Sequence, residues 1–484
     1  MIPPASGMIE SEMGIERLKS WLNWIGITPA LGGVSGYILG WAIWQPHGLS
    51  FGWLLALSIL CAQNRSRSFH FIAFLGYYFA ALNLPLASLR DYNPAPLAAF
   101  ATRLDQLLLA MILAFPYAIF AGGKETQSWR AGIGSIVALV STAVPPLGGV
   151  GLASPLLGAT AWFPDFGVEG LLAYLLFFGF CVTILHGLFS SRVMLFLLGL
   201  SIMAMSVQAS GTLSGRRTDP GGLYCQSTQH CPMQQIMIIS YPFGQTVRTW
   251  AGFQARANLI TRLGETALKE NPHARLLVYP EEVAGPLDHA FALLYAHFTT
   301  ALHKHLATAA IGAIVPWKIQ TGVHKQRSRT LWSDGIVLIG QHHRVLIARQ
   351  PAPVAEWDPL AQVLHDDRSS MPAFWSLPVD HKAGTSHPPL DHAAYGKTHL
   401  AALICYEQAL VWPLLWTLVR HHPTIILAPE SVHWEKSPAI GDLEGRLARA
   451  WGRLYDLPVA IAVNLPPARL HAARHPAHGD LHQT

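Results

Sequence analysis

The sequence predicts an α-helical membrane domain of about seven spans, followed by an α/β domain. Three observations lead to this prediction. The chain has 484 residues, which is more than one ordinary domain needs. Charged residues make up 13% and hydrophobic residues 51%, and most long apolar runs lie in the first ~210 residues. From Gln234 onward, short apolar runs alternate with segments of helical periodicity.

The predicted membrane domain contains seven hydrophobic segments. Several have the roughly 17 to 25 residues that a membrane-spanning helix needs. The segment Gly48–Ala62 is shorter, and we expect it to be tilted or re-entrant. The segments lie near Trp24–Trp44, Gly48–Ala62, Phe69–Leu89, Leu97–Ala121, Gly132–Leu152, Gly170–Phe189 and Val193–Ala209.

Basic residues in alternate loops predict the orientation of these spans. The segment Met1–Ser20 is polar and mixed in charge, which is typical of a cytoplasmic segment and not of a cleavable signal sequence. The outside loops before the last span hold essentially Arg90 alone. Seven crossings place the chain after Ala209 in the periplasm, if the membrane is a bacterial inner membrane. The basic residues on the cytoplasmic side are Arg17, Lys19, Arg65, Arg67, Lys124, Arg130 and Arg192.

Changes in composition give the expected domain boundaries. They are 1–20 for the cytoplasmic segment, 21–210 for the membrane domain, 211–233 for a linker, 234–466 for the α/β domain and 467–484 for a disordered tail. Histidines in the tail fall at helical spacing, but an intervening proline and glycine break any helix, which favours a solvated tail over a metal site.

The linker contains two cysteines, Cys225 and Cys231, with five residues between them. In an oxidising compartment this pair would close a small disulfide loop. Two free thiols, or a metal site that also uses His230, are the alternatives that the spacing leaves open.

The α/β domain is expected to contain eight strands and four helices in alternation. The strands are Ile236–Ser240, the run that ends at Glu281, Thr308–Pro316, Thr330–Ile339, Arg344–Arg349, Ala401–Ile404, Thr424–Ala428 and Val459–Val463. The helices are Ala255–Lys269, Leu287–His305, Leu410–Val419 and Asp442–Tyr455.

Two of these strands end in residues that can carry chemistry. The run Ala401–Ile404 leads into Cys405-Tyr406-Glu407, and an upstream strand leads into Tyr279-Pro280-Glu281. The carboxyl ends of strands are where α/β sheets build their sites. A thiol becomes a nucleophile when a neighbouring base or cation favours the thiolate, and Glu281 is a candidate for that base.

A strand that ends in Pro-Glu, followed later by one that ends in Cys-Tyr-Glu, resembles the nitrilase (carbon–nitrogen hydrolase) superfamily. The resemblance implies a nitrilase-like α/β sandwich whose site is a Glu base, a Lys and a Cys nucleophile, without cofactor or metal. Combined with the predicted spans, the chain resembles the membrane-bound apolipoprotein N-acyltransferases. These move an acyl chain from a phospholipid to the N-terminal amine of a lipoprotein through a cysteine thioester. The matching stretches are Thr249-Trp250, Tyr279-Pro280-Glu281, Gly335–Leu338, Pro353-Val354-Ala355-Glu356, Cys405-Tyr406-Glu407 and, loosely, Glu430–Trp434.

The resemblance implies a role for each matched residue. Glu281 is the base and Cys405 the nucleophile. The position of the family's lysine is occupied by Ala348, so its neighbour Arg349 is the nearest candidate cation for an oxyanion. Arginine, with its planar and permanently charged fork, is not equivalent to lysine, which puts turnover in doubt. Glu356 and Glu407 would orient the cation and the nucleophile, with ordinary surface or salt-bridge carboxylates as the alternative. Tyr406, beside the nucleophile, and Trp250 would line an acyl or headgroup pocket, with buried aromatic packing as the alternative. Trp434 would bind substrate.

The implied partners are a phospholipid acyl donor, a protein or peptide amine acceptor, and the membrane. The formal charge of +5 is small and not clustered, which argues against direct binding of nucleic acid. The family continues into further strands and a last membrane helix, whereas this chain ends soon after Asn464. In this it also resembles the TraB proteins of plasmid conjugal-transfer operons. Two alternatives remain: a non-catalytic scaffold of a conjugation apparatus, and an amidase of the same fold.

Overall fold

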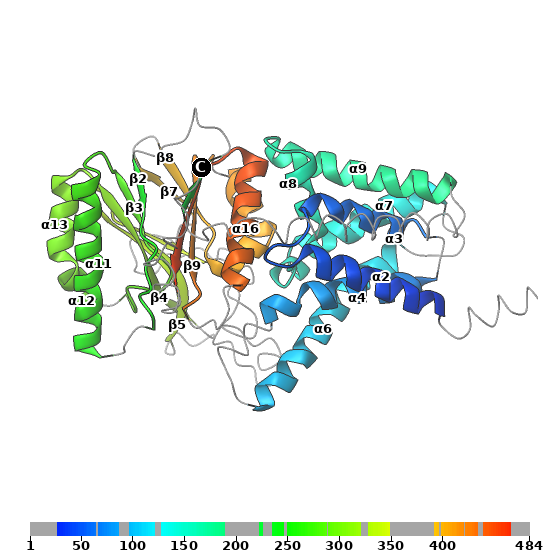
Figure 1. Cartoon of the computed structure of the whole chain (residues 1–484), viewed down its shortest axis with the longest axis horizontal. Coiled ribbons are helices and arrows are strands. Elements are labelled where there is room, and N and C mark those ends of the chain that lie inside the picture. The colour runs from blue at the N-terminus through cyan, green and yellow to red at the C-terminus, as the bar shows by residue number, and fades with distance from the viewer. Residues whose placement is uncertain are drawn as a thin grey trace, which may run out of the picture.

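A helical domain and an α/β domain lie side by side in the computed structural model of the chain (Figure 1). The structure describes residues 27–63, 66–86, 96–121, 127–188, 222–225, 235–245, 249–287, 289–320, 328–348, 392–395, 398–420, 422–433 and 439–465. The main helices of the first domain are α2 (Ile27–Ile43), α4 (Arg67–Ala81), α6 (Pro96–Phe120), α7 (Ser128–Ala143) and α9 (Gly167–Leu188). Shorter elements join them: η1 (Phe51–Ala56), α3 (Leu57–Cys61), η2 (Leu147–Gly149), η3 (Pro155–Gly158) and α8 (Ala159–Trp162).

These helices confirm the predicted helical domain, but the number of spans stays a prediction. Six of the seven hydrophobic segments coincide with described helices, and Val193–Ala209 lies outside the described residues. Within the described ranges, Thr102–Phe120 and Gly167–His186 are long and apolar enough to cross a membrane. The segment Phe51–Cys61 is apolar but shorter.

The helical domain is apolar on its outside and partly polar inside. Large apolar side chains face outward, among them Phe115 on α6 and Leu176 and Phe180 on α9. In the interior, the buried Trp44 Nε1 donates to the Tyr77 hydroxyl at 2.9 Å, and that hydroxyl donates to Ala153 O at 2.8 Å. Water-soluble domains bury apolar groups and expose polar ones, so this distribution is suited to an apolar surrounding.

Helices α2 and α4 pack with their backbones unusually close together. A Cβ atom at Gly36 would lie 1.9 Å from Ala73 O, and one at Gly76 would lie 2.1 Å from Gly33 O. Only glycine fits at such positions, and small residues that let helices approach closely are typical of helix pairs in membranes.

The α/β domain is a sandwich of two five-stranded sheets. Sheet A has the order β1 (Gly222–Tyr224), β10 (Val459–Asn464), β9 (Ile425–Ser431), β8 (Thr398–Ala402) and β7 (His392–Tyr395). Sheet B has the order β2 (Ile236–Ile238), β3 (Leu276–Val278), β4 (Thr308–Gln320), β5 (Ser328–Gly340) and β6 (Arg344–Ile347). Strands β8, β9 and β10 are parallel, as are β2, β3 and β4.

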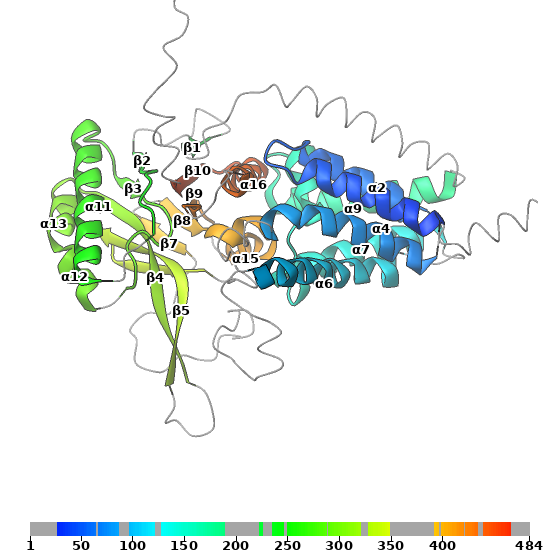
Figure 2. The same ribbon diagram turned by 60° about the horizontal axis from the view of Figure 1, so that its bottom comes forward.

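Helices cover the outer face of each sheet. On sheet B they are α11 (Trp250–Glu270), α12 (His289–Leu294) and α13 (Ala296–Lys304), and on sheet A they are α15 (Trp412–Arg420) and α16 (Ala439–Tyr455) (Figure 2). Between the sheets lies an apolar layer, which includes Val278, Leu338, Ile404 and Leu427. Strands buried on both faces are apolar throughout, which is why runs such as Leu276–Val278 show no alternation.

The predicted α/β pattern is confirmed, with three differences. Part of the expected linker, Gly222–Tyr224, forms β1 and pairs antiparallel with β10 at the edge of sheet A. Cys225, directly after β1, is disulfide-bonded, whereas Cys231 lies outside the described residues. Strand β7 was not predicted, because its four residues are too few for the sequence to show the alternation of a strand. The helix expected at Leu287–His305 is divided into α12 and α13.

Helix α16 lies between sheet A and the helical domain (Figures 1 and 2). The same apolar core contains Leu447 and Trp451 of α16, side chains of β9 and β10, and the interior of the helical domain. The Arg446 guanidinium donates to Ile43 O and Gln45 O, each at 2.8 Å, and to Leu49 O. The two domains are therefore joined by a continuous core and by hydrogen bonds from α16.

Candidate functional site

Cys405 occupies a strained turn directly after β8. Its φ is +45°, a left-handed value that residues with a side chain rarely adopt. The turn starts the short helix η6 (Cys405–Ala409). Just before it, the Leu403 N–H donates to Leu427 O at 2.8 Å and keeps the chain in register with β9. Backbone strain of this kind is concentrated at functional sites, where the surrounding structure enforces it.

Glu407 holds this turn closed. Its carboxylate is buried and accepts the Ile404 N–H at 3.2 Å, while its own N–H donates to Ile404 O at 3.0 Å. The predicted role of Glu407 in orienting the nucleophile is consistent with these two bonds. A carboxylate that accepts a backbone N–H near the start of a helix is a stable arrangement.

The cysteine thiol contacts a carboxylate that comes from α16. Cys405 Sγ donates to Glu444 Oε1 at 3.8 Å, and Glu444 is only 8% exposed. Cys405 itself is half-buried and packs against the layer between the sheets. A carboxylate within hydrogen-bond reach of a thiol is placed to accept its proton.

A second carboxyl group, Glu430, lies at the end of β9 and is fully buried. With its amide oriented so that both ends find partners, Gln408 donates to Glu430 Oε1 and to Glu444 O, each at 3.1 Å. Burial raises the pKa of Glu430 well above its usual value, and the charges of Glu444 and Glu281 raise it further, against the opposing effect of Arg449. Burial and the neighbouring acids therefore favour the neutral form of Glu430.

Glu281 is the third carboxyl group of this cluster, and it is 3% exposed. Its loop lies directly on β4: the Gly312 N–H donates to Pro280 O at 3.1 Å, and the Ala284 N–H donates to Gly312 O at 2.9 Å. A Cβ atom at Gly312 would lie 2.4 Å from Glu281 Cα, so this close approach requires glycine. The electrostatic effect of Glu281 on Glu430 shows that β3 and β9 bring their acids to one region.

The carboxyl ends of the two sheets meet beside this cluster. Tyr241, after β2, forms a parallel bridge with Asn464 of β10. The Asn464 side chain donates to Ser431 Oγ and to Gly244 O, each at 3.3 Å. Nearby, burial and the Arg256 charge lower the pKa of His433, which keeps that imidazole neutral. The polar edge of the sandwich is thus the edge that sequence reasoning predicts from strand ends.

Tyr406 connects the nucleophile turn to the helical domain. Its hydroxyl donates to Gly149 O, in η2 after α7, at 3.1 Å. Burial raises the pKa of Tyr406, so the phenol stays protonated and donates. The predicted role of Tyr406 in lining an acyl or headgroup pocket stays a prediction.

The structure gives less information on the other predicted site residues. Trp250 is the first residue of α11 and is 56% exposed, and its substrate-binding role stays a prediction. Arg349, Glu356 and Trp434 lie outside the described residues, so their roles also stay predictions. Ala348, at the position of the family's lysine, is buried and donates its N–H to Asp334 O at 2.8 Å.

Glu430 and Glu444 were not predicted from the sequence as members of the site. A signal for Glu430 was present, because Ala428-Pro429-Glu430 repeats the strand–Pro–Glu pattern of Tyr279-Pro280-Glu281. Glu444 falls on the apolar face of α16, next to Leu443 and one turn before Leu447. A buried carboxylate needs a polar partner, so an acidic residue on the apolar face of a helix indicates a buried polar contact. This pattern was the signal for Glu444.

Two conjugal transfer proteins are similar to this chain over most of its length. It is 23% identical over 447 residues to a probable conjugal transfer protein TraB of Sinorhizobium fredii, a match that covers 90% of this chain and 98% of the relative. It is 25% identical over 346 residues to the conjugal transfer protein TraB of Agrobacterium fabrum, covering 71% of this chain and 69% of the relative. These two relatives confirm the predicted resemblance to TraB proteins.

Among solved structures, the chain is similar to a carbon–nitrogen hydrolase from Helicobacter pylori G27. The sequence identity is 13%, the TM-score is 0.28, and the match covers 47% of this chain and 72% of the hydrolase. No protein-family model matches the chain.

The buried acid Glu430 gives a prediction about stability and pH. Its folded pKa is above the unfolded value, so wild type loses stability as pH rises from the unfolded pKa towards the folded one. Glu430→Gln keeps a neutral hydrogen-bonding group, so the variant does not lose stability in this way as the pH rises. At pH 8 we expect the variant to melt roughly 2–4 °C higher than wild type, which corresponds to about 1 kcal/mol. At pH 5 we expect the difference to become small.

Thermal unfolding of the detergent-solubilised chain at the two pH values measures this effect. Glu270→Gln, on the exposed side of α11, is the matched control. Wild type that is more stable than Glu430→Gln at pH 8 would mean that Glu430 is charged and paired, contrary to our interpretation.

Proposed function

We propose that this chain is a membrane-bound acyltransferase of a conjugal transfer system, in which Cys405 carries an acyl group from a phospholipid to an amine. The observation that supports it most is the contact of the Cys405 thiol, on a strained turn, with the buried carboxylate of Glu444. The names of the two relatives support the conjugal context. The predicted resemblance to N-acyltransferases supports the reaction.

The proposed location is the bacterial inner membrane, with several crossings and the α/β domain in the periplasm. The two long apolar helices and the apolar outer surface of the helical domain support a membrane location. The disulfide at Cys225 supports an oxidising compartment for the α/β domain, as does the distribution of basic residues in the loops. A lipid donor would then be available beside the site.

In the first step the thiol is acylated. Glu444 takes the proton of Cys405 Sγ, and the sulfur attacks the ester carbonyl carbon of the phospholipid. The tetrahedral intermediate breaks its carbon–oxygen bond, and the departing alkoxide takes the proton back from Glu444. The products are an acyl-thioester on Cys405 and a lysophospholipid. Burial favours the neutral form of Glu430, and this form would leave Glu444 without a second negative charge beside it during this step.

In the second step the acyl group moves to the acceptor. The neutral amine of a protein or peptide attacks the thioester carbon, and the carbon–sulfur bond breaks. Glu281, the carboxylate that the sequence predicts as a base, takes the proton that the amine loses and returns it to the thiolate. An amide and the free thiol result. Arg349 is the proposed cation for the oxyanion in both steps.

The experiment traps the thioester on the purified full chain. After incubation with phosphatidylethanolamine, intact-protein mass spectrometry should detect one added acyl group on wild type and none on Cys405→Ala. The control Cys181→Ala, which removes a free cysteine in α9, should be acylated like wild type. Equal labelling of Cys405→Ala and wild type would refute the proposal. No labelling of either would favour the non-catalytic scaffold, and hydrolysis of a small amide without acyl labelling would favour an amidase.

The same assay separates the two proposed proton carriers. Glu444→Gln should lower the rate of thioester formation by about 10²-fold or more, the usual scale for a general base. Glu281→Gln should form the thioester but transfer it slowly to a peptide amine. The opposite result, in which Glu281→Gln alone abolishes the thioester, would assign the thiol proton to Glu281.

Reporter fusions test the proposed orientation. Alkaline phosphatase is active only in the periplasm, so a fusion at Gly221 should be active and one at Lys124 inactive. Activity at both positions, or at neither, would contradict the orientation with seven crossings.

A further inference from the structure

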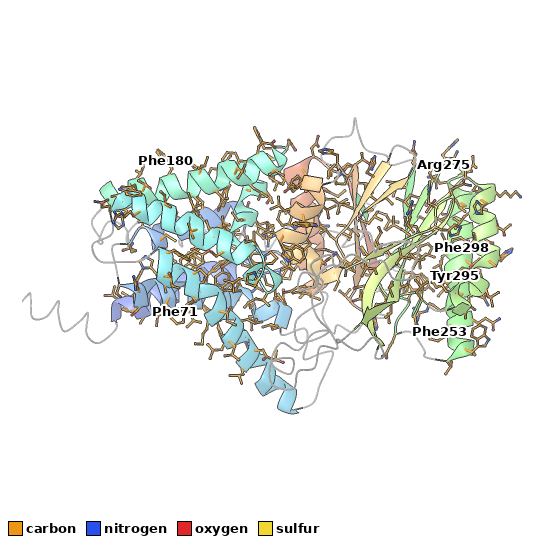
Figure 3. All side chains as sticks on the ribbon, turned by 180° about the vertical axis from the view of Figure 1, so that it is seen from behind. Phe71, Phe180, Phe253, Arg275, Tyr295 and Phe298 are labelled. Atoms are coloured by element: carbon orange, nitrogen blue, oxygen red, sulfur yellow. The ribbon has the colours of Figure 1, made fainter. Side chains whose placement is uncertain are left out.

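An apolar groove opens on the outside of the helical domain. It has a volume of about 620 Å³ and runs along η1, α3 and α9. Its walls include Trp53, Ile59, Trp162, Phe180 and Leu185. Two of these side chains are also exposed to the surroundings, Trp162 at 48% and Phe180 at 60%, and Figure 3 shows Phe180 at the outer edge of α9. The groove therefore opens toward the apolar surrounding of the helices.

A basic pocket lies at the end of this groove that faces the α/β domain. Its volume is about 310 Å³, and Ser50 lines both the pocket and the groove. Arg446, Arg449 and Arg453 of α16 line it together, because residues three and four apart share one face of a helix. Thr160 and Tyr224 complete its walls with neutral polar groups.

The pocket carries an excess of positive charge. Among the described residues that line it, none is an aspartate or glutamate. Arg446 donates to main-chain carbonyls, which do not neutralise it, and its side chain lies over the Phe51 ring at 4.1 Å. Burial and the neighbouring Arg449 lower the pKa of Arg446 to about 10, so it remains charged at pH 7. Two acids outside the pocket lining, Glu430 and Asp442, oppose the lowering of the pKa of Arg449 that burial causes.

We propose that this pocket and groove together bind one anionic membrane phospholipid, with its phosphate on the arginines and an acyl chain in the groove. Arginine is well suited to phosphate because its planar fork can donate two parallel hydrogen bonds. The neighbouring apolar groove is the complementary surface for a hydrocarbon chain. Three positive charges favour a lipid of net negative charge over a zwitterionic one.

This lipid site is distinct from the proposed reaction site. Successive residues of a helix are rotated by about 100°, so the three arginines lie roughly 140–200° around α16 from Glu444. Glu444 faces Cys405, whereas the arginines line a pocket whose other walls come from η1, α8 and β1. Arg449 also acts electrostatically on Glu430. A lipid bound there would contact both domains at their junction and would not be consumed by the acyl transfer.

Native mass spectrometry of the detergent-purified full chain tests this inference. With phosphatidylglycerol or phosphatidylcholine added at equal concentration, we expect one retained phosphatidylglycerol and at least a ~10-fold preference for it. Arg449→Gln with Arg453→Gln should weaken its retention about 10-fold or more. The matched control is Arg262→Gln with Arg344→Gln, on exposed positions of α11 and β6. Cys405→Ala should retain the lipid as wild type does.

A second pair of variants tests the acyl part of the site. Cys181→Trp fills the groove and should lower retention, whereas Leu176→Trp, on the exposed side of the same helix, should not. Melting temperatures of all variants check folding. Equal retention by wild type and the Arg449/Arg453 variant, no preference for phosphatidylglycerol, or loss of lipid in Cys405→Ala would overturn the proposal. Equally strong binding of free glycerol phosphate would show a simple anion site and would also overturn it.

Discussion

The packing of α16 between sheet A and the helical domain determines where the reactive groups lie. Toward the sheet, α16 presents Glu444 to the Cys405 thiol, and its Trp451 donates to Gln408 O at 2.8 Å. Toward the helices, Arg446 holds the backbone around η1, and the Asp165 N–H donates to Arg453 O at 3.0 Å. A shift of α16 relative to either neighbour would break contacts on both faces. The geometry at Cys405 is thus coupled to the helical domain.

A second constraint is the burial of four carboxyl groups in the region of one thiol: Glu281, Glu407, Glu430 and Glu444. Glu281, Glu430 and Glu444 cannot all be charged at low cost in this environment, because burial and mutual repulsion both disfavour the ionised forms. This conflict is greatest at Glu430, the most deeply buried of these carboxyl groups, whose pKa is raised well above its usual value. In the proposed mechanism, Glu281 and Glu444 act in proton transfer at different steps.

The sequence predicted those parts of the site that follow from local patterns. Cys405 and Glu281 were found because each follows an apolar strand, and Glu407 because it is two residues from the cysteine. Glu444 is 39 residues from Cys405, and the contact of Tyr406 with Gly149 spans 257 residues, so both depend on tertiary packing. The α/β elements followed from periodicity, whereas the four-residue β7 and the three-residue edge strand β1 were too short to recognise. Helices α2, α4 and α7 have 17, 15 and 16 residues, so length alone does not identify them as spans.

The central claim is that the helical domain positions the nucleophile, and the bond from Tyr406 to Gly149 tests it most directly. Tyr406→Phe removes one hydroxyl and leaves the ring in place, with Tyr37→Phe on the exposed side of α2 as the control. The measurement is the rate of Cys405 acylation by phospholipid. Loss of a buried hydrogen bond costs ~1 kcal/mol or more, so we expect the rate to fall roughly 5- to 10-fold while the protein stays folded. An unchanged rate in Tyr406→Phe would contradict the claim.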